Sequence, residues 1–133
     1  MIITNEILNE LTEKAKASER LRANLDLRNT PEDQSQRMLN ALEPGTVMPI
    51  HRHHGSSETV IILRGKTRWA FYDDNGTETE SIILDAEGEV RCINVEKNRW
   101  HSLSCLESAV LFESKDGPYH PLEEGEILVV DRF

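Results

Sequence analysis

The stretch that decides the fold is GTVMPIHRHHGSSETVIILRG, at residues 45–65. Its apolar opening leads to His51 and His53, which are two residues apart and share one face if this segment is a strand. Small and polar residues at 54–57 then indicate a turn. Glu58 opens a second apolar run, so antiparallel pairing of the two strands predicts its carboxylate beside the two imidazoles. Two imidazoles and a carboxylate are most of a ligand set for a divalent metal ion.

A fourth ligand is expected from a strand that is distant in the sequence, and His101 is the best candidate. It follows the polar turn at 96–99 and opens a new segment of alternating apolar and polar residues. With His51, His53 and Glu58 it completes a set of three imidazoles and one carboxylate, which leaves one or two positions open on an octahedral ion. Iron, manganese, nickel and zinc all suit such ligands, so the sequence predicts one divalent ion without identifying it.

The spacing in this stretch resembles the first sequence motif of the cupins. Gly45 and Gly65 frame it, and His51, His53 and Glu58 occupy its defining positions. The resemblance implies an all-β fold, a small antiparallel jelly-roll (cupin) barrel, with an N-terminal α-helix packed outside. It also implies a homodimer, since cupins often pair through edge strands or swapped termini.

The segment that ends at His101 resembles the second cupin motif, with three departures. Glu96 and Asn98 stand where cupins usually have a proline and a glycine, and Cys105 stands where they have an asparagine. Asn98 still permits the turn, because asparagine tolerates the left-handed backbone conformation that glycine usually supplies. We expect Cys105 to share the inward face with His101 but to be an inert core thiol.

Most of the chain resembles the WbuC-type cupin-fold metalloproteins. The resemblance lies in RMLNALEPG at 37–45, HRHH at 51–54 and KDGPY at 115–119. WbuC-type proteins neighbour surface-polysaccharide biosynthesis, which implies a sugar or a nucleotide sugar as the small-molecule ligand.

Four residues are candidates for binding that ligand. The resemblance implies that Tyr119 helps to close the pocket, and that Arg22 and Asn24, with Arg20, lie over the barrel mouth and clamp an anionic substrate. Asn40 is polar within an apolar strand, so it faces either the pocket or solvent. The alternative for the arginines is an ordinary solvated face.

Length and charge limit the class of protein. A chain of 133 residues is long enough for one domain with a core that needs no disulfides. The net charge of −9 argues against nucleic acid or an anionic membrane as a partner. The chain has neither an apolar run of membrane-spanning length nor a secretory pattern, and Cys92 and Cys105 do not form a disulfide framework, so we expect a cytoplasmic protein with reduced thiols.

The chain divides into a helical start and a region of short strands. Apolar residues at helical spacing predict a helix over 1–18, followed by an arm to residue 36 that wraps across the barrel; the barrel itself occupies 37–133. The dipeptide Asn75-Gly76 predicts a hairpin. The predicted strands are 37–42, 46–53, 58–64, 67–73, 79–84, 90–95, 100–105, 108–114 and 126–131.

The ligand set allows more than one function. The first hypothesis is a metal-dependent enzyme, an isomerase or a dioxygenase, in which Glu58 shuttles a proton. The second is a non-catalytic module that binds or senses a metal or a sugar. A metal-free, epimerase-like cupin is disfavoured, because it would need a His-Asp pair instead.

The two remaining histidines are not expected to be ligands. Strand alternation turns His54 away from the site, and His120 is expected in an exposed loop.

Overall fold

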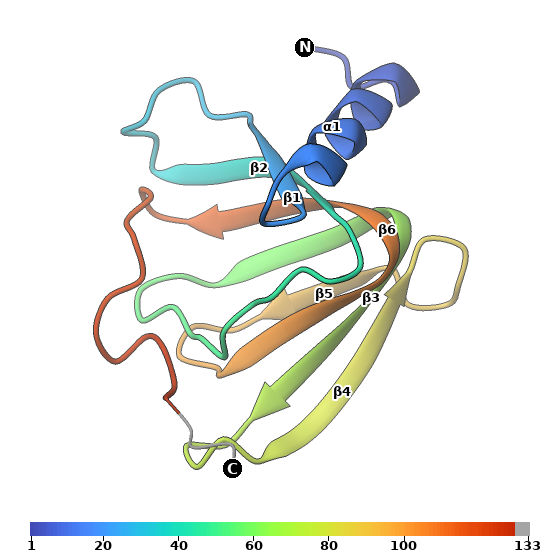
Figure 1. Cartoon of the computed structure of the whole chain (residues 1–133). Helices are drawn as coiled ribbons and strands as arrows, with labels where there is room; N and C mark the ends of the chain where they lie inside the picture. Colours follow the sequence, from blue (N-terminus) through green and yellow to red (C-terminus); the bar gives the residue numbers. More distant parts are fainter. Residues whose placement is uncertain (130–133) are drawn as a thin grey trace.

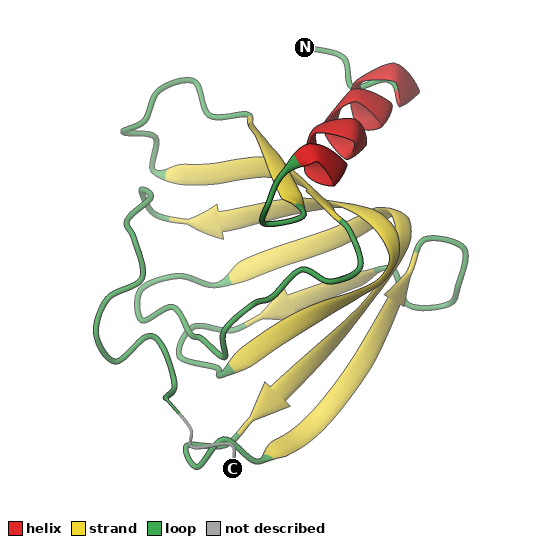
Figure 2. Ribbon diagram, viewed as in Figure 1, coloured by secondary structure: helices red, strands yellow, loops and turns green. Residues whose placement is uncertain are grey.

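The fold is a bent, six-stranded antiparallel sheet with one helix outside it (Figures 1 and 2). The computed structural model describes residues 1–129. The elements are α1 (Asn5–Ala17), β1 (Arg22–Asp26), β2 (Ser35–Leu42), β3 (Glu58–Tyr72), β4 (Glu78–Asp85), β5 (Cys92–Val95) and β6 (His101–Asp116). The strand order is β1-β2-β6-β3-β4, with β5 also paired to β3.

The N-terminal helix covers the β1–β2 end of the sheet. Thr4 caps α1 by accepting a hydrogen bond from the Ile7 N–H. Leu8, Leu11 and Ala15 are its buried residues, and their spacing places them on one face. This face packs on apolar residues of the outer side of β1, β2 and β6, so the predicted helix is confirmed with slightly shorter bounds.

The two long strands form the frame of the barrel. In Figure 1, β3 and β6 run along one wall, bend sharply together and return in the opposite wall. The bend lies near Gly65, where the register between the two strands shifts repeatedly. The four short strands predicted at 58–64, 67–73, 100–105 and 108–114 are therefore two continuous ones, because a strand can turn through a glycine without losing its partner.

Three other predictions need correction. Residues 46–53 form an extended loop with only an isolated bridge at His51, and part of the arm, β1, is a regular strand of the sheet. The predicted strand 126–131 is reduced to a bridge at Ile127, and residues 130–131 lie outside the described part of the chain. The hairpin at Asn75-Gly76 is confirmed between β3 and β4.

The barrel encloses an apolar core. Trp69, Phe71, Leu84 and Leu111 belong to a cluster of buried side chains contributed by most of the strands. Within residues 1–129, no helix is both long enough and apolar enough to cross a membrane.

Candidate metal centre

A short extended segment carries two of the three clustered histidines, and hydrogen bonds hold it at both edges. On one side, His51 and His101 exchange backbone N–H···O bonds of 2.9 Å. On the other side, the Arg52 N–H donates to the Glu126 carbonyl and the Leu128 N–H donates to the Ile50 carbonyl, both at 2.9 Å. The segment is thus fixed in the barrel although it is not a regular strand.

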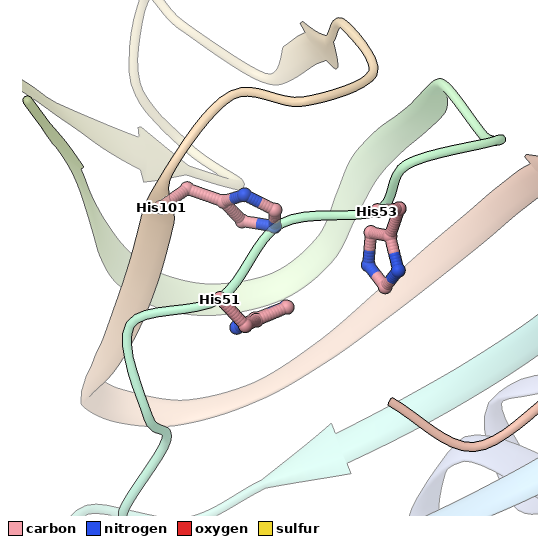
Figure 3. Close-up of side chains that lie close together, drawn as sticks. All are labelled: His51, His53 and His101. Carbon is pink, nitrogen blue, oxygen red and sulfur yellow. The ribbon is translucent and has the colours of Figure 1, made fainter. Parts of the chain in front are cut away.

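Three imidazoles meet inside the barrel, as Figure 3 shows. His101 is the first residue of β6 and is 1% exposed, while His51 and His53 come from the loop before β3. One nitrogen from each ring can be chosen so that all three lie within 4.8 Å of one another. The indole of Trp69 lies nearly parallel to the His101 ring, with centroids 6.1 Å apart. The predicted meeting of His51, His53 and His101 is therefore present.

The hydrogen bonds of the rings suit metal binding. The Nδ1 atom of His51 lies 3.0 Å from the Pro49 carbonyl, and the Nδ1 atom of His101 lies 2.8 Å from the Arg99 carbonyl. A carbonyl only accepts, so in each ring Nδ1 carries a proton. The Nε2 atom of the neutral His51 ring therefore offers a lone pair, whereas Nε2 of His101 hydrogen-bonds the Glu58 carboxylate and would give up its proton to bind an ion. The Nε2 atom of His53 is buried and has no hydrogen-bond partner in the described residues. An orphaned buried nitrogen beside the oriented lone pair of His51 and the pair of His101 with Glu58 fits a cation.

Glu58 lies against this cluster. It is 4% exposed, with Oε1 at 3.1 Å from His101 Nε2 and Oε2 at 4.0 Å from His53 Nε2. Two neighbouring ligands, each about 2.1 Å from an octahedral ion, are about 3.0 Å apart, so the first distance suits two atoms that share a metal. Burial acts to raise the pKa of Glu58, but the hydrogen bond with His101 and the charge of Lys115 outweigh it and hold the pKa at about 2.

The route by which Glu58 reaches the histidines differs from the prediction. Glu58 pairs with Val95 on β5 and with Lys115 on β6, whereas His51 pairs with His101. The predicted hairpin between 46–53 and 58–64 does not form. Glu58 and the histidines come together because backbone hydrogen bonds hold the loop beside the start of β6.

The two loop histidines are held in the neutral, ligating form. Burial and the nearby charge of His101 lower the pKa of His51 to about 4. Burial and the charge of Lys115 lower the pKa of His53 to about 4. Both rings are therefore neutral at physiological pH.

The structure adds three charged residues that the sequence analysis did not single out. Lys115 places Nζ 3.5 Å from Glu58 Oε2, and Glu113 accepts a hydrogen bond of 2.8 Å from Asn40. Glu126 is fully buried and accepts from the His54 N–H at 2.8 Å, which ties the C-terminal segment to the histidine loop. Alternation along β6 puts Glu113 and Lys115 on one face, but only their strand partners show that this face is the interior.

A cavity of about 390 Å³ opens beside the cluster and is lined by His51, His53, Glu58 and His101. The four residues proposed to bind the small molecule, Arg22, Asn24, Asn40 and Tyr119, all line it. Arg20 and His120 also lie on its wall, and both are exposed. Burial, then the negative charge of Glu58, raises the pKa of Glu113, another lining residue, to about 7.

Cys105 lies away from the cavity, although it is on the same strand as His101. Its thiol donates to the Leu42 carbonyl at 3.3 Å, and burial with the charge of Glu43 raises its pKa to about 11. A thiol with so high a pKa is a poor nucleophile and a poor ligand. Cys92 is exposed, and both cysteines are free.

His54 provides a test of the ligand assignment. It is exposed, and its Nδ1 lies 2.8 Å from the Asn98 side-chain oxygen instead of facing the cluster. Asn98 itself has the expected left-handed backbone, with φ of 66°. We expect His54→Ala to leave the metal content of the purified protein unchanged by elemental analysis. A loss as large as that of a His53→Ala variant would contradict the arrangement.

One family model matches this chain. The model of a family described as "Domain of unknown function (DUF6016)" matches residues 3–84, which is more than half of the chain. The chain belongs to this family. The search of curated proteins found no match.

Solved structures show which fold the DUF6016 chain has. It is similar to the Schizosaccharomyces pombe Cnp3 cupin domain, with a TM-score of 0.58 and 15% identity over 74% of this chain and 66% of that one. It is also similar to the capsular polysaccharide assembling protein CapF from Staphylococcus aureus, with a TM-score of 0.65 and 17% identity over 85% of this chain. A third similarity is to Bacillus subtilis oxalate decarboxylase, a protein with Mn(II) centres, with a TM-score of 0.57 and 19% identity over 80% of this chain.

These likenesses show a cupin-like jelly roll and no more, because the identities are low. The DUF6016 chain spans only 30% of the CapF chain and 27% of the oxalate decarboxylase chain. The histidine cluster of this chain is consistent with a metal site.

Proposed function

We propose that this DUF6016 protein binds one divalent metal ion through His51, His53, Glu58 and His101. With that ion it binds and acts on a small polar metabolite, such as a sugar or nucleotide sugar of surface-polysaccharide metabolism. The observation that carries the proposal is the convergence of three imidazoles and a buried carboxylate on the wall of one cavity. The WbuC-type resemblance supports the choice of metabolite, as does the likeness to CapF, a capsular polysaccharide assembling protein.

The residues of the site would have separate roles in binding the ion. A bound divalent ion supplies Lewis-acid polarisation of an oxygen on the small molecule. His51 and His101 are oriented by the backbone carbonyls that their Nδ1 atoms face, so their Nε2 atoms need no rearrangement to bind. Lys115 keeps Glu58 ionised, which is the form of the carboxylate that binds a cation.

Glu58→Gln tests the ligand set. The change is isosteric but removes the charge, so we expect metal affinity to fall by at least about 100-fold, the upper end of the loss for an outer-shell partner, while the protein stays folded. Glu113→Gln is the matched control, because Glu113 is also a buried carboxyl of the cavity but hydrogen-bonds Asn40 instead of a histidine. Competition with a chelating dye measures both affinities. Equal affinities in the two variants would remove Glu58 from the site.

Turnover separates the enzyme from the binding module. The metal-loaded protein is mixed with sugars and nucleotide sugars, with and without oxygen, and products are followed by NMR. Conversion that needs the metal and fails in Glu58→Gln supports an enzyme, and its dependence on oxygen separates dioxygenase from isomerase. Saturable binding without conversion supports the module. If there is neither, the proposed ligand class is wrong.

A further inference from the structure

Two arginines at the cavity are left without an acidic partner in an acid-rich protein. The chain has 24 acidic and 15 basic residues. Arg20 and Arg22 line the cavity, yet neither forms an ion pair within residues 1–129. Four arginines elsewhere do pair with carboxylates: Arg28, Arg37, Arg68 and Arg99.

Arg22 is the better placed of the two. Its neighbours Ala23 and Leu25 pack on the helix side of β1, so alternation turns Arg22 and Asn24 to the cavity. Its side-chain contact is a distance of 2.7 Å from Nη1 to the Met48 sulfur, and a thioether is a weak acceptor that leaves the charge uncompensated. A half-buried guanidinium with free donors is suited to a carboxylate or phosphate.

The wall beside Arg22 is polar. Asn24 pairs directly with Asn40 across β1 and β2, and the Asn40 amide donates to Glu113 at 2.8 Å. Amide and carboxyl groups in this row can both donate to and accept from hydroxyl groups. Apart from the two arginines, Lys115 is the one lysine or arginine on this wall among residues 1–129, and it is already matched by Glu58 at 3.5 Å.

The cavity is poorly suited to binding a nucleobase. Its volume of about 390 Å³ is near the lower end for small-molecule pockets. Of the tryptophan and tyrosine side chains that line it, Trp69 is 1% exposed and covered by the site, so only Tyr119, at the mouth and 59% exposed, can stack on a ring. Any base of a larger ligand would therefore lie outside.

From this placement we infer that the site takes a small, hydroxylated anion, a sugar acid or a sugar phosphate, whose acidic group binds Arg22 and whose hydroxyl groups meet the Asn24–Asn40–Glu113 row. The inference rests on the proposed function and narrows its ligand: the charge of Arg22 selects the acidic group, and the histidine cluster lies on the wall of the same cavity.

Calorimetric titration of the full chain tests this inference, with D-glucuronate, D-glucose 6-phosphate and neutral D-glucose as probes. We expect at least one of the two anions to bind about 10-fold or more tighter than glucose, because charge-assisted hydrogen bonds are the stronger kind. The better of the two anions identifies carboxylate or phosphate as the preferred group. Arg22→Gln should remove the preference, and Arg22→Lys should keep part of it. Arg91→Gln is the control, since Arg91 is exposed and lies off the cavity, and its side chain hydrogen-bonds only the Gly88 carbonyl among residues 1–129.

Two outcomes would overturn the inference: equal binding of glucose and both anions, including no binding of any probe, or an Arg22→Gln variant that behaves like Arg91→Gln. The metal content of each sample is measured in parallel. A protein that holds its metal but shows no preference for anions refutes this inference alone, whereas a protein without metal refutes the proposed function. Thermal melting of Arg22→Gln against Arg91→Gln shows whether a loss of binding comes from unfolding.

Discussion

His51→Ala is expected to lower metal content from about one ion per chain to nearly none, with affinity reduced by more than about 100-fold. His51 supplies one of three convergent imidazoles, and its Nδ1 is already committed to the Pro49 carbonyl. An alanine leaves two imidazoles and Glu58, and no other histidine lies in the cluster among the described residues. Elemental analysis after dialysis against metal-free buffer measures the loss.

The control for this experiment is His120→Ala. His120 lines the same cavity but is exposed and lies outside the cluster, so its removal should leave metal content unchanged. Circular dichroism should show that both variants keep the sheet, because His51 is held through backbone bonds that alanine retains. Full metal content in His51→Ala would show that the ion, if present, lies elsewhere.

Gly65→Ala is expected to lower the free energy of unfolding by about 2–5 kcal/mol. Gly65 has φ of +77°, where an L side chain is strained, and an added Cβ would lie 2.0 Å from the Ser108 carbonyl oxygen. This is the point where β3 and β6 bend together, so the clash falls on two backbones that cannot move independently. Urea unfolding measures the change.

Two other glycines separate the causes of this effect. Gly117 has φ of +78° but open space around an added Cβ, so Gly117→Ala should cost only the backbone strain, about 1–2 kcal/mol. Gly55 has neither a positive φ nor a neighbour within 4 Å, so Gly55→Ala should change stability by less than about 0.5 kcal/mol. A Gly65→Ala variant no less stable than Gly117→Ala would show that the bend can relax.

Much of the candidate site could be anticipated from local spacing. The interval between His51 and His53, the carboxylate at Glu58 and the turn before His101 were enough to nominate residues that the fold brings together. The left-handed conformation of Asn98 was likewise predictable, because it depends on the residue's own short side chain. Such features are properties of a few consecutive residues.

The way in which these residues meet was not predictable. The period of two in a strand says which residues share a face, but not which strand lies opposite. Glu58 was expected across a hairpin from the histidines, yet its partners are Val95 and Lys115. Lys115 was therefore given no role of its own beyond its place in the KDGPY run, because its role depends on a contact with Glu58, 57 positions away in the chain.

By itself, then, the sequence determined the all-β class, the N-terminal helix and the identity of the clustered histidines, since each depends on composition and spacing along the chain. Only the tertiary structure decided that β3 and β6 are continuous through their bend, that Glu126 anchors the histidine loop, and that Arg22 faces the cavity without an acidic partner in the described chain. The physical reason is that pairing and burial are set by contacts between distant segments, whose free energies no local pattern records.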